Sequence, residues 1–193
     1  MSENQLILAL KEGSDSAFRN LVETYQNRVY NTCLGLLQNE SDAEETAQDV
    51  FIEVHRSIGA FRGESKLSTW LYKIATTKSL ELIRKNKRQK RFAFLQSLAG
   101  SNETSDSLKQ AHFVHPGIEM EQKENAKALF QAIGQLPETQ KVAFTLHKIE
   151  GLAYQQISEI METSVSSVES LMFRARKNLQ KTLKGYYEKN FKN

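Results

Sequence analysis

Basic residues recur at helical spacing in the first half of this 193-residue sequence. Lys73, Thr77, Arg84 and Arg88 follow one another at intervals of four or seven residues, and the run 84–91 is mostly basic. Residues at such intervals lie on one face of an α-helix. Lysine and arginine side chains on that face could neutralise the phosphates of a nucleic acid. A solvated helix face without a ligand is the alternative.

Aromatic residues lie close to this basic segment. Phe61 precedes a polar loop, and Trp70 and Tyr72 follow soon after that loop. Aromatic rings beside a basic groove are the side chains that hold unstacked bases of single-stranded nucleic acid. We assign Trp70 to the core, and the sequence leaves the roles of Phe61 and Tyr72 open.

An acidic ridge is expected on the preceding helix, opposite an apolar stripe. Its members are Asp42, Glu45, Asp49 and Glu53, with Gln48 beside them. Such a ridge could bind a basic helical partner, although a solvated face is the usual alternative. Carboxylates that run along a ridge without a second shell of ligands make a poor Mg²⁺ site, so we expect no metal there.

A helix-turn-helix pattern lies near the C-terminus. A short amphipathic helix over 154–161 is followed by a three-residue turn and a longer helix that Ser164 can cap. The second helix has an apolar stripe at Val165, Val168, Met172, Ala175 and Leu179. Its opposite face carries Ser166, Ser167, Ser170, Arg174 and Lys177. Such a face could enter the major groove of DNA, and a plain αα-hairpin is the alternative.

The sequence lacks the patterns of common catalytic and cofactor sites. Its four histidines show no metal-ligand spacing, and no glycine-rich phosphate loop or nucleophile elbow occurs. The single cysteine, Cys33, excludes an internal disulfide and a cysteine-rich metal site. We therefore expect that the chain is not an enzyme and that it binds no metal or cofactor.

The elements that must position these residues are all predicted to be helices. In the first part of the chain they are expected at about 4–12, 15–38, 42–58 and from 67 into the basic run. Ser14 or Asp15 should cap the second helix, and Ser41 with Glu44 should form a capping box for the third.

Periodicity is lost between about 93 and 117, where polar residues and His115-Pro116-Gly117 predict a flexible linker. Four more helices are expected at about 118–133, 137–150, 154–161 and 165–183. The predicted fold is therefore all-α, with two small helical domains, 1–92 and 118–193, joined by a linker over 93–117.

Charge is distributed unevenly along the chain, although the net charge is only +3. Residues 1–60 carry −6, residues 61–91 carry +8, residues 92–130 carry −2 and residues 131–193 carry +3. Two basic regions separated by acidic ones predict two contacts with a polyanion. No long apolar run occurs, so we expect a cytoplasmic protein without a membrane insertion.

Two stretches of the sequence resemble a known family. Residues 42–88, DAEETAQDVFIEVHRSIGAFRGESKLSTWLYKIATTKSLELIRKNKR, resemble region 2 of extracytoplasmic-function (ECF) sigma factors. Residues 136–179, LPETQKVAFTLHKIEGLAYQQISEIMETSVSSVESLMFRARKNL, resemble their region 4. The resemblance implies a subunit that directs core RNA polymerase to promoters, with promoter DNA and the polymerase as partners.

The resemblance also implies roles for individual residues. The acidic helix would dock on the β′ clamp helices through Asp42, Glu45, Gln48 and Asp49. The loop at 61–65 and the next helix would engage and melt the −10 element through Phe61, Lys73, Thr77, Arg84 and Arg88. The helix-turn-helix would read the −35 element through Ser166, Ser167, Ser170, Phe173, Arg174 and Lys177. Region 4 would also contact the β flap, and an anti-sigma factor is a common partner in the family.

Four positions depart from the family pattern. Many relatives have Asn at Thr77, Asp at Glu81, and Arg at Glu169 and Leu171. Because of these differences, we expect the promoter sequence that this chain recognises to differ from the one common in the family. The rival interpretation is a stand-alone helix-turn-helix regulator, which would leave the acidic ridge and the loop at 61–65 without a role.

Overall fold

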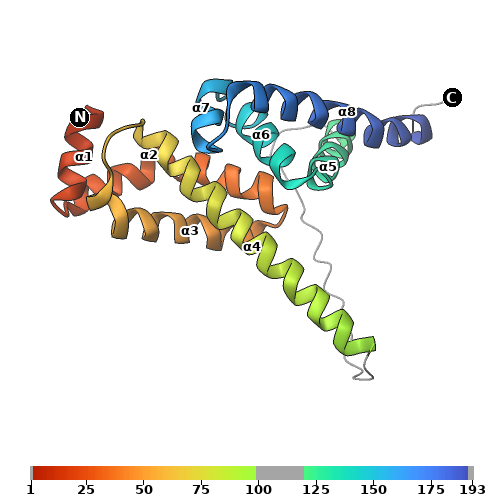
Figure 1. Ribbon diagram of the computed structural model, residues 1–193, viewed down its shortest axis with the longest axis horizontal. Coiled ribbons are helices and arrows are strands. Elements are labelled where there is room, and N and C mark those ends of the chain that lie inside the picture. The colour runs from red at the N-terminus through yellow and green to blue at the C-terminus, as the bar shows by residue number, and fades with distance from the viewer. Residues whose placement is uncertain (1, 99–119, 191–193) are drawn as a thin grey trace.

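The computed structural model describes residues 2–98 and 120–190, and every regular element among them is helical. Figure 1 shows an N-terminal domain in red to green and a C-terminal domain in cyan to blue that packs on one side of it. The prediction of an all-α fold is confirmed. None of the described helices is long and apolar enough to cross a membrane.

The N-terminal domain is a four-helix assembly. Its elements are α1 (Glu3–Lys11), α2 (Asp15–Leu37), α3 (Glu40–Ser57), the 3-10 turn η1 (Ile58–Ala60) and α4 (Leu67–Leu98). The apolar stripe predicted for α3 meets α2 and α4 in one core, in which Leu21, Val50 and Leu71 are almost fully buried. Burial of these side chains holds the three helices together.

Two helix starts show how local chemistry sets the element boundaries. Ser14 caps α2 as expected, with its hydroxyl accepting from the Ala17 N–H at 3.3 Å. The predicted cap of α3 is wrong, because the Asn39 side chain accepts from the Asp42 N–H at 2.9 Å and the helix begins at Glu40. Asn39 is as good a capping residue as Ser41, and it follows the left-handed turn at Gln38 directly.

The longest helix, α4, runs past the end of the basic run. Residues 93–98, which were predicted to open the linker, continue it, and in Figure 1 its last turns extend beyond the rest of the domain. The rest of the predicted linker and the first two residues of the next predicted helix lie outside the described residues.

The C-terminal domain contains α5 (Met120–Gly134), α6 (Glu138–Lys148), α7 (Tyr154–Ile160) and α8 (Val165–Asn190). The predicted apolar face of α8 is confirmed at Val168, Met172, Ala175 and Leu179, which are all buried with Ile157 of α7. Glu162 has a left-handed backbone in the turn, and the Ser164 hydroxyl accepts from the Ser167 N–H at 3.2 Å. These features form the helix-turn-helix that the sequence predicted.

Candidate nucleic-acid and partner interfaces

The acidic ridge is a solvent-facing surface of α3. Glu45, Gln48 and Asp49 are exposed and Asp42 is half-buried, while the opposite face of the helix enters the core. The ridge therefore offers carboxylates to a partner without disturbing the fold. Glu53, at the end of the ridge, lies 3.5 Å from Lys78 of α4 and is partly neutralised by it.

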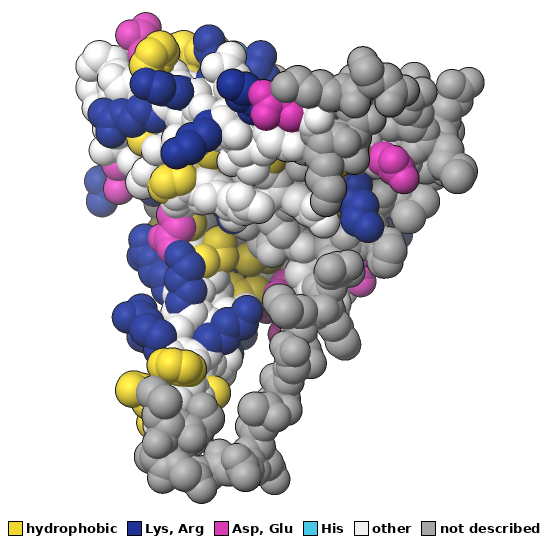
Figure 2. Space-filling view, turned by 90° about the vertical axis from the view of Figure 1, so that its right-hand side faces the viewer, with side chains coloured by type: hydrophobic (Ala, Val, Ile, Leu, Met, Phe, Trp, Pro, Cys, Tyr) yellow, Lys and Arg dark blue, Asp and Glu magenta, His cyan; other side chains and the backbone are white. Residues whose placement is uncertain are grey.

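The basic face of α4 is brought together as predicted. Lys73, Thr77, Arg84 and Arg88 are all exposed, and Lys87 joins them. Lysine and arginine side chains gather along the protruding part of α4, below the C-terminal domain, in Figure 2. A surface groove of about 580 Å³ is lined there by four cations and two carboxylates: Arg84, Lys87, Arg88, Arg91, Glu81 and Glu138. Four or more cations along one helix match the requirements for contact with a nucleic-acid backbone.

A pocket of about 330 Å³ lies between the loop after η1 and the first turn of α4. Its walls include Phe61, Trp70 and Lys73, and Glu159 of α7 lies at its edge. An aromatic wall beside a cation suits an unstacked base.

Phe61 lines this pocket but is largely buried. The residue is only 6% exposed, and its ring lies 4.9 Å, centroid to centroid, from the ring of Trp70. Core packing leaves little of Phe61 accessible to a base, and its contact with the −10 element stays a prediction. Trp70 packs against the core, as expected, but remains partly accessible.

The predicted recognition face of α8 is accessible. Ser166, Ser170 and Arg174 are exposed, Ser167 is half-buried, and Phe173 is 69% exposed. Lys177 continues the same face one turn further on. The exposed Phe173 ring could make an apolar contact with a base edge or a partner.

Arg176 makes a contact that the sequence did not predict. Its guanidinium donates to the Tyr154 hydroxyl at 3.0 Å, and the Tyr154 ring packs against His147 with a centroid distance of 4.9 Å. The contact joins α7 to α8 in addition to their apolar packing. No local pattern predicts a pairing across 22 residues.

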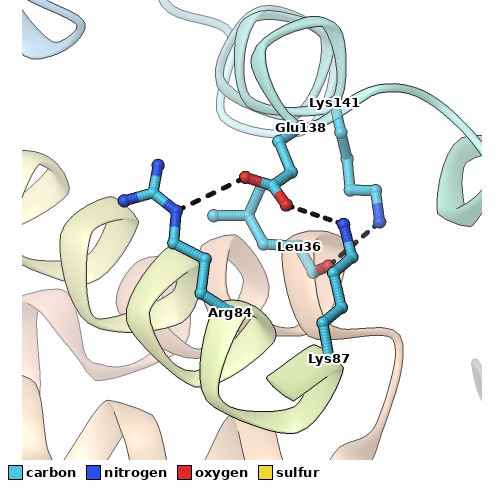
Figure 3. Close-up of polar contacts among 5 residues, drawn as sticks. All are labelled: Leu36, Arg84, Lys87, Glu138 and Lys141. Atoms are coloured by element: carbon cyan, nitrogen blue, oxygen red, sulfur yellow. Dashed lines mark hydrogen bonds and ion pairs between the residues drawn. The ribbon is translucent and has the colours of Figure 1, made fainter. Parts of the chain in front are cut away.

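The two domains meet along α2 and α4. The carboxylate of Glu138, at the start of α6, lies between two cations of α4, 2.7 Å from Lys87 Nζ and 3.6 Å from Arg84 Nε (Figure 3). The Lys87 ammonium, with Arg84, holds the pKa of the Glu138 carboxyl below its usual range. Lys141, one turn along α6, is buried and donates to the Leu36 carbonyl at 3.4 Å, and burial lowers its pKa.

Two further polar contacts cross the same boundary. Lys73 of α4 pairs with Glu162 in the turn of the helix-turn-helix. The hydroxyl of Tyr72 is buried and donates to Glu150 at 2.9 Å. Burial raises the pKa of Tyr72 and also that of Glu150. Tyr72, whose role the sequence left open, is therefore a domain-contact residue.

No group of three or more potential metal ligands occurs in the part of the chain that the structure describes. The described surfaces instead offer two kinds of contact, carboxylates on α3 and cations with polar or aromatic groups on α4 and α8. This arrangement supports binding of a protein partner and of nucleic acid.

Comparisons with known proteins agree with both halves of this description. The family model for sigma-70 region 2 matches residues 21–89, and the model for sigma-70 region 4 matches residues 126–179. The ECF RNA polymerase sigma-E factor of Haemophilus influenzae is 35% identical over 184 residues, which cover 93% of this chain and 94% of the relative. The RNA polymerase sigma-H factor of Pseudomonas aeruginosa is 33% identical over 182 residues, covering 94% and 93%.

Solved structures share the fold. CnrH, solved in complex with the cytosolic domain of CnrY, aligns with a TM-score of 0.68 at 17% identity and covers 95% of this chain and 97% of that chain. The sigma factor RpoE of Bartonella quintana, solved with the anti-sigma factor NepR, aligns with a TM-score of 0.65 at 20% identity and covers 86% and 96%.

Proposed function

This chain belongs to the ECF sigma factors of the sigma-70 family, and we propose which of its surfaces perform each step of transcription initiation. As a sigma factor it binds core RNA polymerase and directs initiation at specific promoters. The N-terminal domain is region 2, and the C-terminal domain is region 4 with its helix-turn-helix. The family is one of transcription initiation factors, and we expect no catalytic activity of this chain's own.

The proposed docking surface for the polymerase is the acidic ridge of α3. Asp42, Glu45, Gln48 and Asp49 would contact the β′ clamp helices. Three of these four side chains are exposed, and the helix that carries them is anchored by buried residues on its other side. A rigid helix with accessible carboxylates loses little conformational entropy when a basic partner binds.

The proposed −10 surface is the basic face of α4 with the adjoining pocket. Lys73, Thr77, Arg84 and Arg88 would hold the melted strand, with an unstacked base in the pocket beside Trp70. Cations supply affinity for the phosphates, and the aromatic wall favours unstacked over stacked bases. Phe61 would form part of the pocket wall beside Trp70.

The proposed −35 surface is the exposed face of α8. Ser166, Ser167, Ser170 and Phe173 would approach base edges, and Arg174 and Lys177 would contact phosphates. The observation that carries the whole proposal is the coexistence in one chain of an accessible helix-turn-helix and a basic helix with an aromatic pocket. A stand-alone regulator needs only the first. An anti-sigma factor that covers these faces is a further proposed partner, and the polymerase as partner implies action in the cytoplasm.

Two single substitutions test the assignment. Asp49→Ala should weaken binding to purified core polymerase about tenfold, whereas Glu23→Ala, which removes an exposed carboxylate from α2, should not.

Arg174→Ala should retain core binding but lose most run-off transcription from double-stranded promoters. The control variant Lys148→Ala should retain both core binding and transcription. Unchanged core binding by Asp49→Ala would refute the docking surface, and unchanged promoter selection by Arg174→Ala would refute the −35 surface.

A further inference from the structure

A pocket of about 520 Å³ lies where the end of α2 and the second half of α4 meet α5 and α6. Its walls come from both domains, and its volume is in the range of pockets that bind small molecules. Among the described residues, none of those assigned to the −10 or −35 surface lines it, and Asp42 is the one member of the α3 ridge that does. The proposed surfaces therefore leave the pocket without a function.

Three lysines give one side of this pocket a positive charge. Lys87 and Lys90 come from α4, and Lys141 comes from α6. Figure 3 shows the Lys87 and Lys141 side chains reaching from their two helices toward the end of α2. Asp42 is the single carboxylate among the described residues of the lining, so three cations face one anion and the excess is two positive charges. A concave surface with such an excess attracts anions.

The ammonium of Lys141 is buried and poorly compensated. The residue is only 9% exposed, and among the described residues its ammonium makes one hydrogen bond, to the Leu36 carbonyl at 3.4 Å. An ammonium has three N–H donors, so this contact leaves two of them for a ligand. Burial and the nearby Lys87 lower the pKa of Lys141, and Glu138 opposes them only weakly because its carboxylate is shared with Lys87 and Arg84.

The rest of the pocket has a different character from its cationic side. Leu37 of α2 and Ile83 of α4 are half-buried and contribute an apolar wall. Gln131 and Gln135, which are exposed residues one turn apart on α5, add amide groups that both donate and accept hydrogen bonds. An apolar wall and amides beside a group of cations suit a planar heterocycle that carries phosphate groups.

We propose that this pocket binds a nucleotide with two or more phosphate groups. The phosphates lie against Lys87, Lys90 and Lys141 in charge-assisted hydrogen bonds, and the base lies against Leu37 and Ile83. Because the ligand touches both domains, its binding stabilises the folded chain by mass action. The proposal does not depend on the assignment of the −10 and −35 surfaces, since the pocket uses other residues.

The pocket requires both of its walls, and one glycine lets the domains come close enough to form it. A Cβ atom at Gly35 of α2 would lie 2.7 Å from Thr145 Cγ2 and 3.0 Å from Ile149 Cδ1, both in the C-terminal domain. Thr145 is fully buried, and its branched side chain is stiff. Gly35→Leu should therefore force the two walls apart. Gly185→Leu is the matched control, since a Cβ atom at that glycine of α8 would have nothing within 4 Å.

Isothermal titration calorimetry on the full chain tests the proposal with four probes: ADP, GDP, inorganic pyrophosphate and adenosine. Lys141→Gln removes the buried cation, and Lys148→Gln, at an exposed lysine of the same helix, is its control. Lys90→Gln removes an exposed cation of the pocket, and Lys85→Gln is its control on α4. Circular dichroism reports whether each variant is folded.

We expect at least one of the two nucleotides to bind with one site per chain, pyrophosphate to bind more weakly, and adenosine not to bind. Lys141→Gln should weaken nucleotide binding about tenfold, because it removes a charge-assisted hydrogen bond in a buried position. Lys90→Gln should weaken it about threefold, because that cation is exposed to solvent. Gly35→Leu should abolish binding, and the three control variants should bind as the wild type does.

Absence of binding by both nucleotides would overturn the proposal, as would unchanged affinity in folded Lys141→Gln. Should Lys141→Gln fail to fold, unchanged affinity in Lys90→Gln is the contradicting result. Binding that is lost in Arg88→Gln and kept in the pocket variants would place the nucleotide on the basic face of α4 and would also overturn it. Pyrophosphate that binds as tightly as both nucleotides would refute the contact with a base.

Discussion

Glu138 and Glu150 are two carboxylates at the same domain boundary whose surroundings act on them in opposite directions. Glu138 faces Lys87 and Arg84, with Lys141 nearby, and these cations favour its ionised form. Glu150 is enclosed, with Tyr72, Arg28 and Thr32 around it, and desolvation outweighs its hydrogen bonds. Ionisation of Glu138 therefore favours domain closure, and ionisation of Glu150 opposes it.

These directions predict a titration of the free protein. Carboxyl carbon resonances should give Glu138 a pKa below, and Glu150 a pKa above, the ordinary glutamate value. Ionised Glu138 stabilises the packed domains at pH values above the ordinary glutamate pKa, and this stabilisation is lost as the pH falls through its lowered pKa. Protonation of Glu150 has the opposite effect and favours packing of the domains. In Gly35→Leu both values should return toward normal. Normal values for both residues in wild type would contradict the packed boundary.

The exposure of individual side chains was the property hardest to predict from the sequence. The exposed positions of Arg174 and Lys73 follow from helical periodicity, because spacing alone decides which face of an amphipathic helix meets solvent. Phe61 and Tyr72 are both aromatic neighbours of a basic helix, yet both are buried. Whether each ring is buried depends on tertiary packing, and a local sequence pattern carries no information about that packing.

At the scale of the elements, capping explains most of the helix starts. Glu3 of α1 performs this role across a long distance, since its carboxylate accepts from the Leu67 N–H at the start of α4, at 3.1 Å. The contact ties the first helix to the helix that carries the basic face, and it places a negative charge at the positive end of α4. The two residues are 64 positions apart, so the pattern within either helix does not predict this hydrogen bond.

The long-range cap predicts a stability effect. Glu3→Ala should lower the free energy of unfolding by about 1 kcal/mol, because it leaves a helix N–H without its acceptor. Urea denaturation followed by circular dichroism measures this change. Glu3→Gln keeps an acceptor oxygen and should lose less. Equal stability of wild type and Glu3→Ala would show that the cap contributes nothing.

Most elements were predictable, and the exceptions have local causes. The order of helices and the apolar faces of α2, α3 and α8 follow from helical periodicity. The start of α3 was misplaced because Asn39 and Ser41, two positions apart, are both good capping residues. The end of α4 was placed too early, because the basic run resembles a helix terminus although its residues are strong helix formers.

At the scale of the whole molecule, charge segregation predicted two polyanion contacts but not how the domains sit. The −6 of residues 1–60 is concentrated on the α3 ridge, which mostly faces solvent. Only Glu53 of this ridge pairs with α4, through Lys78, and the carboxylates that pair with Lys73 and Lys87 come from the C-terminal domain, whose overall charge is positive. Domain packing depends on a few opposed side chains and on a close helix contact at Gly35, and segment charge gives neither.

We propose that the two helical domains divide the work of promoter recognition. In this proposal one domain presents cations and an aromatic pocket to a melted strand, and the other presents a helix to a duplex groove. Tethering both surfaces on the polymerase raises their effective concentration for the promoter, so we expect the two together to bind more tightly than either alone.

Mapping of transcript 5′ ends with purified core polymerase, with and without this protein, on a promoter library tests this account most directly. We predict that the protein confers a discrete set of start sites, preceded by shared −10 and −35 sequences at a fixed spacing. If core polymerase gives the same starts in the presence and the absence of the protein, the account is contradicted.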